Sequence, residues 1–151
     1  MRLLLAVVPL LALGLTACGN PDTPAGRAAD SRHENFEHIG DAFKVVSDQL
    51  KATAPDVAKI QAAAATINGF APKVEIWFPA GSGPADGIKT DALQTVWTKP
   101  EQFKQASAKF AEEAAKFQAV AQAGDVAALG EGMKGLGGAC KGCHDNFREK
   151  D

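Results

Sequence analysis

The feature that most constrains this chain is the pentad CKGCH at residues 140–144, close to its end. On a helix, Cys140, Cys143 and His144 project from one face, because residues three and four apart are neighbours on a helix surface. A CxxCH pattern is typical of covalent attachment of a c-type haem. The two thiols would form thioethers with the haem, and the imidazole would be one axial ligand of the iron. The pentad thus predicts one covalent haem c, its attachment points and one iron ligand.

Two other uses of the pentad fit less well. A structural zinc site needs four Cys or His ligands in two pairs, and no second pair is present in the sequence. A thioredoxin-like thiol pair lies at the start of a helix in a βαβ unit, whereas this pair lies at the end of a long helical pattern. We therefore favour haem attachment.

Apolar residues recur at helical spacings of three and four along four stretches of the chain. They are Phe36, Ile39, Phe43, Val46 and Leu50; Val57, Ile60, Ala64 and Ile67; Phe103, Phe110 and Phe117; and Val126, Leu129, Met133 and Leu136, which lead into the pentad. The only β-leaning stretch, residues 74–78, is short and isolated. The pattern predicts an all-α fold, an antiparallel four-helix bundle with the haem attached near the C-terminus.

Local signals suggest where these helices begin and end. Residues 31–34 and 98–101 have the form of capping boxes, which start the first and third helices. Gly69 and Gly124 are expected to end the second and third helices, and Asp125 is expected to cap the fourth. The connection 71–97 is longer than usual and rich in Pro and Gly, so we expect it to cross over or to cover the haem edge.

Five glycines precede the pentad within the fourth helix, and each costs about 1 kcal/mol relative to alanine. They are Gly130, Gly132, Gly135, Gly137 and Gly138. One interpretation is close approach of the backbone to the haem or to a neighbouring helix. The alternative is an irregular segment.

The N-terminal region has the features of an export signal. Residues 3–15 form an apolar run behind Arg2 that is too short to span a bilayer. The sequence LTACG at residues 15–19 resembles a bacterial lipoprotein box, in which Cys18 becomes the lipidated first residue. We expect residues 1–17 to be the signal peptide, 18–30 the lipidated cysteine and a flexible tether, and 31–151 the bundle. The alternative is an ordinary secretory signal that leaves Cys18 as a free thiol.

Location and charge limit the partners. A lipid on Cys18 would be the only membrane attachment of a periplasmic protein, and Gly19 in place of aspartate suggests the outer membrane of a Gram-negative bacterium. The chain has 16 basic and 18 acidic residues, so no basic excess points to nucleic acid. A redox partner is expected to present a basic or mixed face.

The C-terminal pentad, Arg32 four residues before Phe36, and Arg148 four residues after His144 together resemble the cytochrome c′ family. The resemblance covers about residues 31–150. It implies that Phe36 stands over the open face of the iron, where low-spin relatives have methionine. It also makes Arg32 a candidate partner of a haem propionate and places Arg148 on the proximal side. Members usually form homodimers, although monomers occur.

The iron is therefore expected to be five-coordinate and high-spin. Met133 shares a helix with His144 and cannot reach the opposite side of the haem, whereas His33 stays open as a sixth ligand and His38 is expected to face solvent. An apolar pocket without a hydrogen-bond donor favours nitric oxide and carbon monoxide. We expect a gas-binding protein that also carries single electrons and is not an enzyme. The alternatives are a six-coordinate electron carrier and a peroxidase-type enzyme with His33 on the distal side.

Overall fold

The computed structural model describes residues 19–150, so the expected signal peptide and Cys18 lie outside the described residues. Its elements are α1 (Pro24–Lys51), α2 (Val57–Phe70), the 3₁₀ helices η1 (Ala71–Trp77) and η2 (Pro84–Asp86), the one-turn α3 (Thr95–Thr98), α4 (Pro100–Ala123) and α5 (Val126–Phe147). Over residues 19–150 the only β-pairing outside the helices is an isolated antiparallel bridge between Ala92 and Arg148. The expected all-α fold is confirmed.

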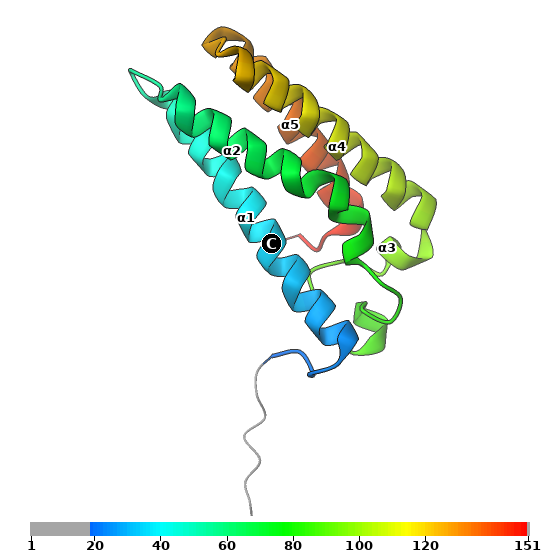
Figure 1. Cartoon of the computed structure of the whole chain (residues 1–151). Helices are drawn as coiled ribbons and strands as arrows, with labels where there is room; N and C mark the ends of the chain where they lie inside the picture. The colour runs from blue at the N-terminus through cyan, green and yellow to red at the C-terminus, as the bar shows by residue number, and fades with distance from the viewer. Residues whose placement is uncertain (1–18, 151) are drawn as a thin grey trace, which may run out of the picture.

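The four long helices run up and down the molecule as an antiparallel bundle (Figure 1). Helix α2 packs against α1 and α4, and α5 packs along α4 and only lightly against α1. The largest fully buried apolar side chains are Val46, Ile60, Ile67, Phe117, Leu129 and Leu136. All six occupy positions of the apolar repeat, and each contributes about 1.5–3 kcal/mol by leaving water.

Helix α1 begins seven residues earlier than expected, at Pro24, so the prediction of a flexible tether over residues 18–30 is wrong for residues 24–30. The Thr23 hydroxyl accepts a hydrogen bond from the Gly26 N–H, and Pro24 occupies the first turn, where its missing N–H costs nothing. The predicted box at residues 31–34 therefore lies inside the helix. The observed cap, Thr23, was not predicted from the sequence.

Other helix ends follow the expected signals in part. Gly124 ends α4 with φ 70°, and Asp125 caps α5 by accepting hydrogen bonds from two backbone N–H groups, as predicted. Gly69 does not end α2, because the backbone stays helical and continues into η1, which contains most of the stretch taken as β-leaning. The box at residues 98–101 is not formed, because the Thr98 hydroxyl donates to the Gln94 carbonyl within α3.

The long connection between α2 and α4 closes one end of the bundle. The Leu93 N–H donates to the Phe147 carbonyl over 2.9 Å, and the Glu149 N–H donates to the Asp91 carbonyl over 2.8 Å. The Trp97 indole donates to the Pro79 carbonyl over 3.0 Å. The connection is therefore fastened to the last residues of α5, directly after the CxxCH pentad.

Candidate functional site

The pentad occupies the last two turns of α5. Cys140 and Cys143 are half-buried and pack against the apolar core, whereas His144 is exposed. Because all five residues are helical, the thiols and the imidazole share one side of the helix, as predicted. The thiols thus lie toward the core and the imidazole lies at its edge.

The chemistry of the thiols argues against a redox pair. Burial raises the pKa of the Cys143 thiol to about 11, with a smaller contribution from Cys140. Burial also raises the pKa of the Cys140 thiol. Redox-active CxxC pairs have lowered thiol pKa values, so the environment favours the neutral, apolar-packed form that suits attachment to a hydrophobic group.

A chain of aromatic rings joins α1 to the end of α5. The Phe36 ring lies 6.3 Å from Phe78, Phe78 lies 4.8 Å from Phe103, and Phe103 lies 5.3 Å from Phe147. Phe147 follows His144 by three residues. The resemblance placed Phe36 over the open face of the iron. The structure joins Phe36 through this chain of rings to Phe147, at the end of the helix that carries the pentad.

Phe36 itself is half-buried, and Trp77 meets it edge-on with ring centroids 5.3 Å apart and an interplanar angle of 88°. One helical repeat later, the Phe43 ring is directed at α5, because a Cβ at Gly137 would lie 3.7 Å from its Cζ. Phe36 and Phe43 are seven residues apart and share a face of α1. This face of α1 is thus apolar, aromatic and turned toward the helix of the pentad.

Arg32 is buried, with only 3% of its surface exposed. One guanidinium nitrogen donates to the Ser82 hydroxyl, and another donates to the Ser82 carbonyl and the Thr90 hydroxyl, each over 2.8 Å. Its Cζ also lies 4.9 Å from the Phe78 ring centroid and 5.6 Å from that of Trp97. Burial lowers the pKa of this guanidinium, and Asp30 partly offsets the change. A haem propionate would share Arg32 with these groups, so that role stays a prediction.

Arg148 differs from the expectation in its backbone. Helix α5 ends at Phe147, and Arg148 is extended, with φ −123° and ψ 144°. The position of the Arg148 side chain therefore cannot be inferred from its spacing of four residues after His144. The Arg148 guanidinium lies 3.9 Å from the Asp91 carboxylate, and its proximal role stays a prediction.

The two histidines of α1 lie in different surroundings. His33 is largely exposed, and its Nε2 lies 3.4 Å from the Glu37 carboxylate. The His38 ring stacks on Phe70 with centroids 5.8 Å apart, so it covers an aromatic side chain as well as facing solvent. Both imidazoles have neighbours on the protein surface.

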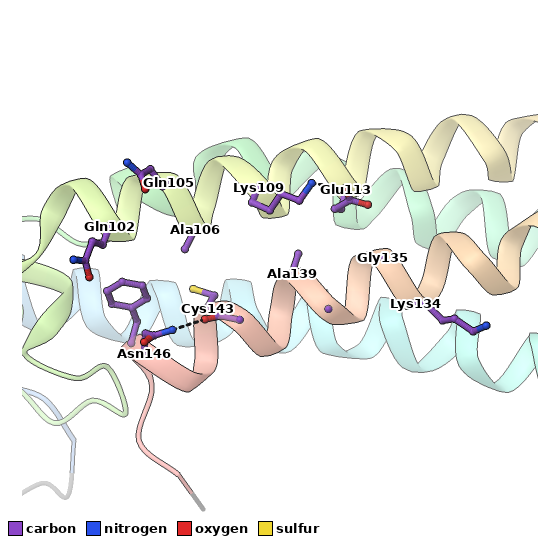
Figure 2. A pocket seen from close by; sticks show the side chains of 13 residues that line it. Gln102, Gln105, Ala106, Lys109, Glu113, Lys134, Gly135, Ala139, Cys143 and Asn146 are labelled. Carbon is purple, nitrogen blue, oxygen red and sulfur yellow. Dashed lines mark hydrogen bonds and ion pairs between the residues drawn. The ribbon is translucent and has the colours of Figure 1, made fainter.

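A groove of about 650 Å³ follows the seam between α4 and α5. Figure 2 shows the Cys143 sulfur directed from α5 toward α4, near Ala106, with Gln102, Gln105 and Lys109 along the α4 side. Cys140 and His144 do not line this groove. It therefore reaches one attachment thiol without the iron ligand.

The glycines of α5 before the pentad differ in their surroundings, and Gly137, which is in ordinary contact with Phe43, lies between the extremes. A Cβ at Gly132 would lie 3.0 Å from the Phe117 ring, and one at Gly135 would lie 2.6 Å from the Glu113 carboxylate. Nothing lies within 4 Å of such an atom at Gly130 or Gly138. Close approach to a neighbouring helix is therefore seen at Gly132, against a ring, whereas at Gly135 the near atom is the end of a flexible side chain. It is not seen at Gly130 or Gly138.

Three further residues of the site were not singled out from the sequence. Trp77, Phe78 and Trp97 all come from the connection between α2 and α4 and complete the aromatic cluster. The only signal was their presence in a connection that is otherwise rich in Pro and Gly.

These residues fit a covalently held haem. Two thiols and an imidazole at the required spacing border an aromatic cluster, and α1 meets α5 only lightly beside them. Such a large apolar group needs apolar and aromatic neighbours. Cys140 and Cys143 would hold it and His144 would ligate its iron.

Comparison with known proteins shows which family the chain resembles. A family model described as "Cytochrome C'" matches residues 27–148. Cytochrome c' of Pararhodospirillum photometricum is 36% identical over 118 residues, which cover 78% of this chain and 93% of that protein.

Solved structures agree as well. The crystal structure of cytochrome c' from Rubrivivax gelatinosus superposes with a TM-score of 0.76 and 32% identity, over 83% of this chain and 97% of that one. A nitric oxide complex of a variant of cytochrome c prime from Alcaligenes xylosoxidans superposes with a TM-score of 0.75 and 27% identity, over 83% and 97% of the two chains.

Proposed function

Because the chain belongs to the cytochrome c′ family, whose members carry one covalently bound haem c, we propose that it is a periplasmic, membrane-tethered cytochrome that binds nitric oxide or carbon monoxide. The iron is five-coordinate and high-spin, with His144 as its protein ligand. The single observation that carries this proposal is the placement of Phe36, a hydrocarbon ring between Trp77 and Phe78 on the helix face turned toward the pentad. A relative that resembles this chain closely in fold has been solved with nitric oxide bound.

The haem, when bound, supplies the iron at which a diatomic gas is held. Cys140 and Cys143 would fix the group to α5, and His144, on the same helix, would ligate its iron. Phe36 occupies space on the α1 side and offers no hydrogen bond to a bound gas. Neutral ligands that need no such bond, nitric oxide and carbon monoxide, are therefore favoured over oxygen and peroxide.

Transfer of single electrons is a second role of the same site. The half-buried thiols leave the pentad near the surface, and His144 is exposed, so an attached haem would have an edge within reach of a partner protein. The partner is a redox protein with a basic or mixed face, because the chain carries slightly more acidic than basic residues.

Cys18 is the proposed lipid anchor, on the basis of the LTACG sequence around it. Within residues 19–150, no helix combines the length and apolar character needed to cross a bilayer. Mass spectrometry of the mature N-terminus tests the anchor, since an unmodified peptide that contains Cys18 would exclude it.

Spectroscopy of the purified holoprotein tests the gas-binding role. Ferric and ferrous spectra should be those of high-spin, five-coordinate iron, and nitric oxide and carbon monoxide should each shift the ferrous spectrum. Low-spin spectra in the absence of added gas would favour the six-coordinate electron carrier. If His33→Ala removed the low-spin signal, His33 would be the sixth ligand. Peroxidase turnover that disappears in His33→Ala would favour the enzyme.

The role of Phe36 has its own test. Phe36→Ala should speed carbon monoxide association by about tenfold, because removing the ring opens the α1 side, whereas the bulky Phe36→Leu should change it little. An association rate unchanged by Phe36→Ala would mean that the ring only packs the core.

A groove between α1 and α2 is the proposed site of homodimer contact. Its lining includes Ala42, Val45, Ala62 and Ala63, and Val45 is 39% exposed. These apolar atoms on a helix pair suit a second copy of the same surface. Val45→Glu should convert a dimer to a monomer in sedimentation experiments.

A further inference from the structure

The residues that directly follow Cys18 belong to the folded domain. The Asn20 side chain donates to the Asp30 carboxylate over 2.7 Å and to the Lys89 carbonyl over 3.1 Å, and its oxygen accepts from the Lys89 N–H over 2.7 Å. One side-chain amide thus links α1 to the connection that follows η2. Each such bond contributes about 0.5–1.5 kcal/mol, and three of them act on a single residue.

The chain between Asn20 and α1 is folded back in a compact turn. The Thr23 N–H donates to the Pro21 carbonyl over 2.7 Å. A Cβ at residue 26 would lie 2.0 Å from the same Pro21 oxygen, so this turn requires Gly26. Asp22 pairs with Arg27 across the turn. Residues 20–27 therefore form a built structure rather than an arm.

A single residue, Gly19, separates Cys18 from Asn20. Extended backbone spans at most about 3.5 Å per residue, so a lipid on Cys18 would bring Asn20 close to the headgroups. We propose that the bundle rests directly on the phospholipid headgroup surface through its lipid-proximal end, defined as residues 20–23 and 84–89. The proposal rests on lipidation of Cys18, which belongs to the proposed function.

The composition of the lipid-proximal end suits a headgroup surface. Its charges are mixed, since Asp22 and Asp86 stand with Lys89, and Asp22 is already paired with Arg27. A surface of this kind neither inserts into the bilayer nor binds strongly to one headgroup charge. The covalent lipid supplies the affinity, and the folded turn supplies the orientation.

The orientation places the haem site in the half of the bundle nearer the membrane. Phe36 lies twelve residues beyond Pro24 along α1, about 18 Å at 1.5 Å per residue. The turn after Lys51 lies at the opposite end of α1, about 40 Å away by the same measure. Figure 1 shows η2 and the start of α1 together at one end, with the α1–α2 turn at the other. A redox partner in the same membrane would therefore reach the haem half first.

Energy transfer to membrane lipids tests the orientation. Single cysteines at Ala85, in η2, or at Thr53, in the α1–α2 turn, are labelled on the lipidated holoprotein in phosphatidylcholine vesicles with acceptor-labelled headgroups. The donor fluorescence of each labelled protein is divided by its donor fluorescence in acceptor-free vesicles. This ratio corrects for quenching of the donor by the haem. Ala85→Cys should transfer at least about twice as efficiently as Thr53→Cys, because the two ends differ by about 40 Å.

A matched control separates orientation from attachment. Inserting about ten Gly and Ser residues between Gly19 and Asn20 adds a flexible reach of roughly 17 Å, and the ratio of the two signals should fall toward one. Asn20→Ala should lower the ratio partly. Equal transfer from both labels in the uninserted, lipidated protein would overturn the proposal. If mass spectrometry found no lipid on Cys18, the proposed lipid anchor would be wrong. The mass of the N-terminal peptide thus distinguishes failure of the anchor from failure of the orientation.

Discussion

The two sides of α5 are built in opposite ways. Toward α4, a Cβ at Gly132 would press on the Phe117 ring at 3.0 Å, and one at Gly135 would displace the end of the Glu113 side chain. Toward α1, contacts are light, and the facing side chains are the rings of Phe36 and Phe43. Near Gly132 the α4 side is therefore a tight seam between helices, and farther along α5 it opens into the groove that reaches Cys143. The α1 side is an aromatic face that suits a flat apolar group.

The largest effect should come from removing the haem attachment. Cys140→Ala combined with Cys143→Ala should abolish covalent haem, because no thioether can form. Acid-acetone extraction of the denatured protein measures this: the colour stays with the wild-type chain and leaves the variant. Lys141→Ala, between the two thiols, is the control and should keep its haem.

The same double variant sharpens the comparison between the two sides. Hydrogen exchange should become faster in the part of α1 around Phe36 and Phe43, which would lose the group that fills the space beside α5. Exchange around Phe117 and Gly132 should change much less. Equal acceleration on both sides would show that the haem supports the whole bundle rather than one face.

Arg32 should give the next largest effect. Arg32→Ala removes three hydrogen bonds from a buried cation and its contacts with two rings, so we expect a loss of about 2–4 kcal/mol in the free energy of unfolding. Urea denaturation measures it. Lys44→Ala, which breaks only an exposed pair with Asp48, should cost less than about 1 kcal/mol.

The Arg32 contacts also show what the sequence could and could not predict. Seam positions such as Val46, Ile67 and Leu136 follow from helical periodicity, which is a local property of the chain. The bonds from Arg32 to Ser82 and Thr90 join residues 50 and 58 positions apart, so they depend on how the long connection folds. Charge and family likeness alone assigned Arg32 to a propionate.

A local signal did not always determine a helix end. Asp125 caps α5 as expected, whereas the backbone stays helical past Gly69. The start of α1 at Thr23 was missed, because it goes together with the fold-back of Gly26 against Pro21, a contact that no sequence pattern announces. The pentad itself was the most predictable part, because its chemistry is contained within five consecutive residues.

The glycine seam should show an intermediate effect. Gly132→Leu drives a side chain into the Phe117 ring and should cost about 1–3 kcal/mol in the free energy of unfolding. Gly130→Leu is the matched control, because nothing lies within 4 Å of a Cβ there, and it should be neutral or stabilise by up to about 1 kcal/mol. Thermal unfolding of both variants measures the difference. Equal costs would mean that α5 is not pressed against α4 at Gly132.

The smallest effect concerns the ion pairs that border the same seam. Hydrogen bonds from Lys109 and Lys116 lower the pKa of the Glu113 carboxyl, and the same lysines lower that of Glu112. A carboxyl with a lowered pKa in the folded state stabilises the fold above its unfolded pKa, and this contribution disappears as the pH falls through the lower folded value. Stability should therefore decline slightly below about pH 4.5.

Glu113→Gln keeps the shape of the side chain that lies against Gly135 and removes only its charge. The variant should match the wild type at low pH and be slightly less stable at pH 7. Salt should reduce the difference, because the partner lysines are exposed and screened. Glu101→Gln, on α4 outside these pairs, is the control. A larger loss of stability at pH 7 that salt does not reduce would mean that Glu113 acts through its packing against Gly135. The packing of α5 on α4 would then depend on that carboxylate as well as on the glycines of α5.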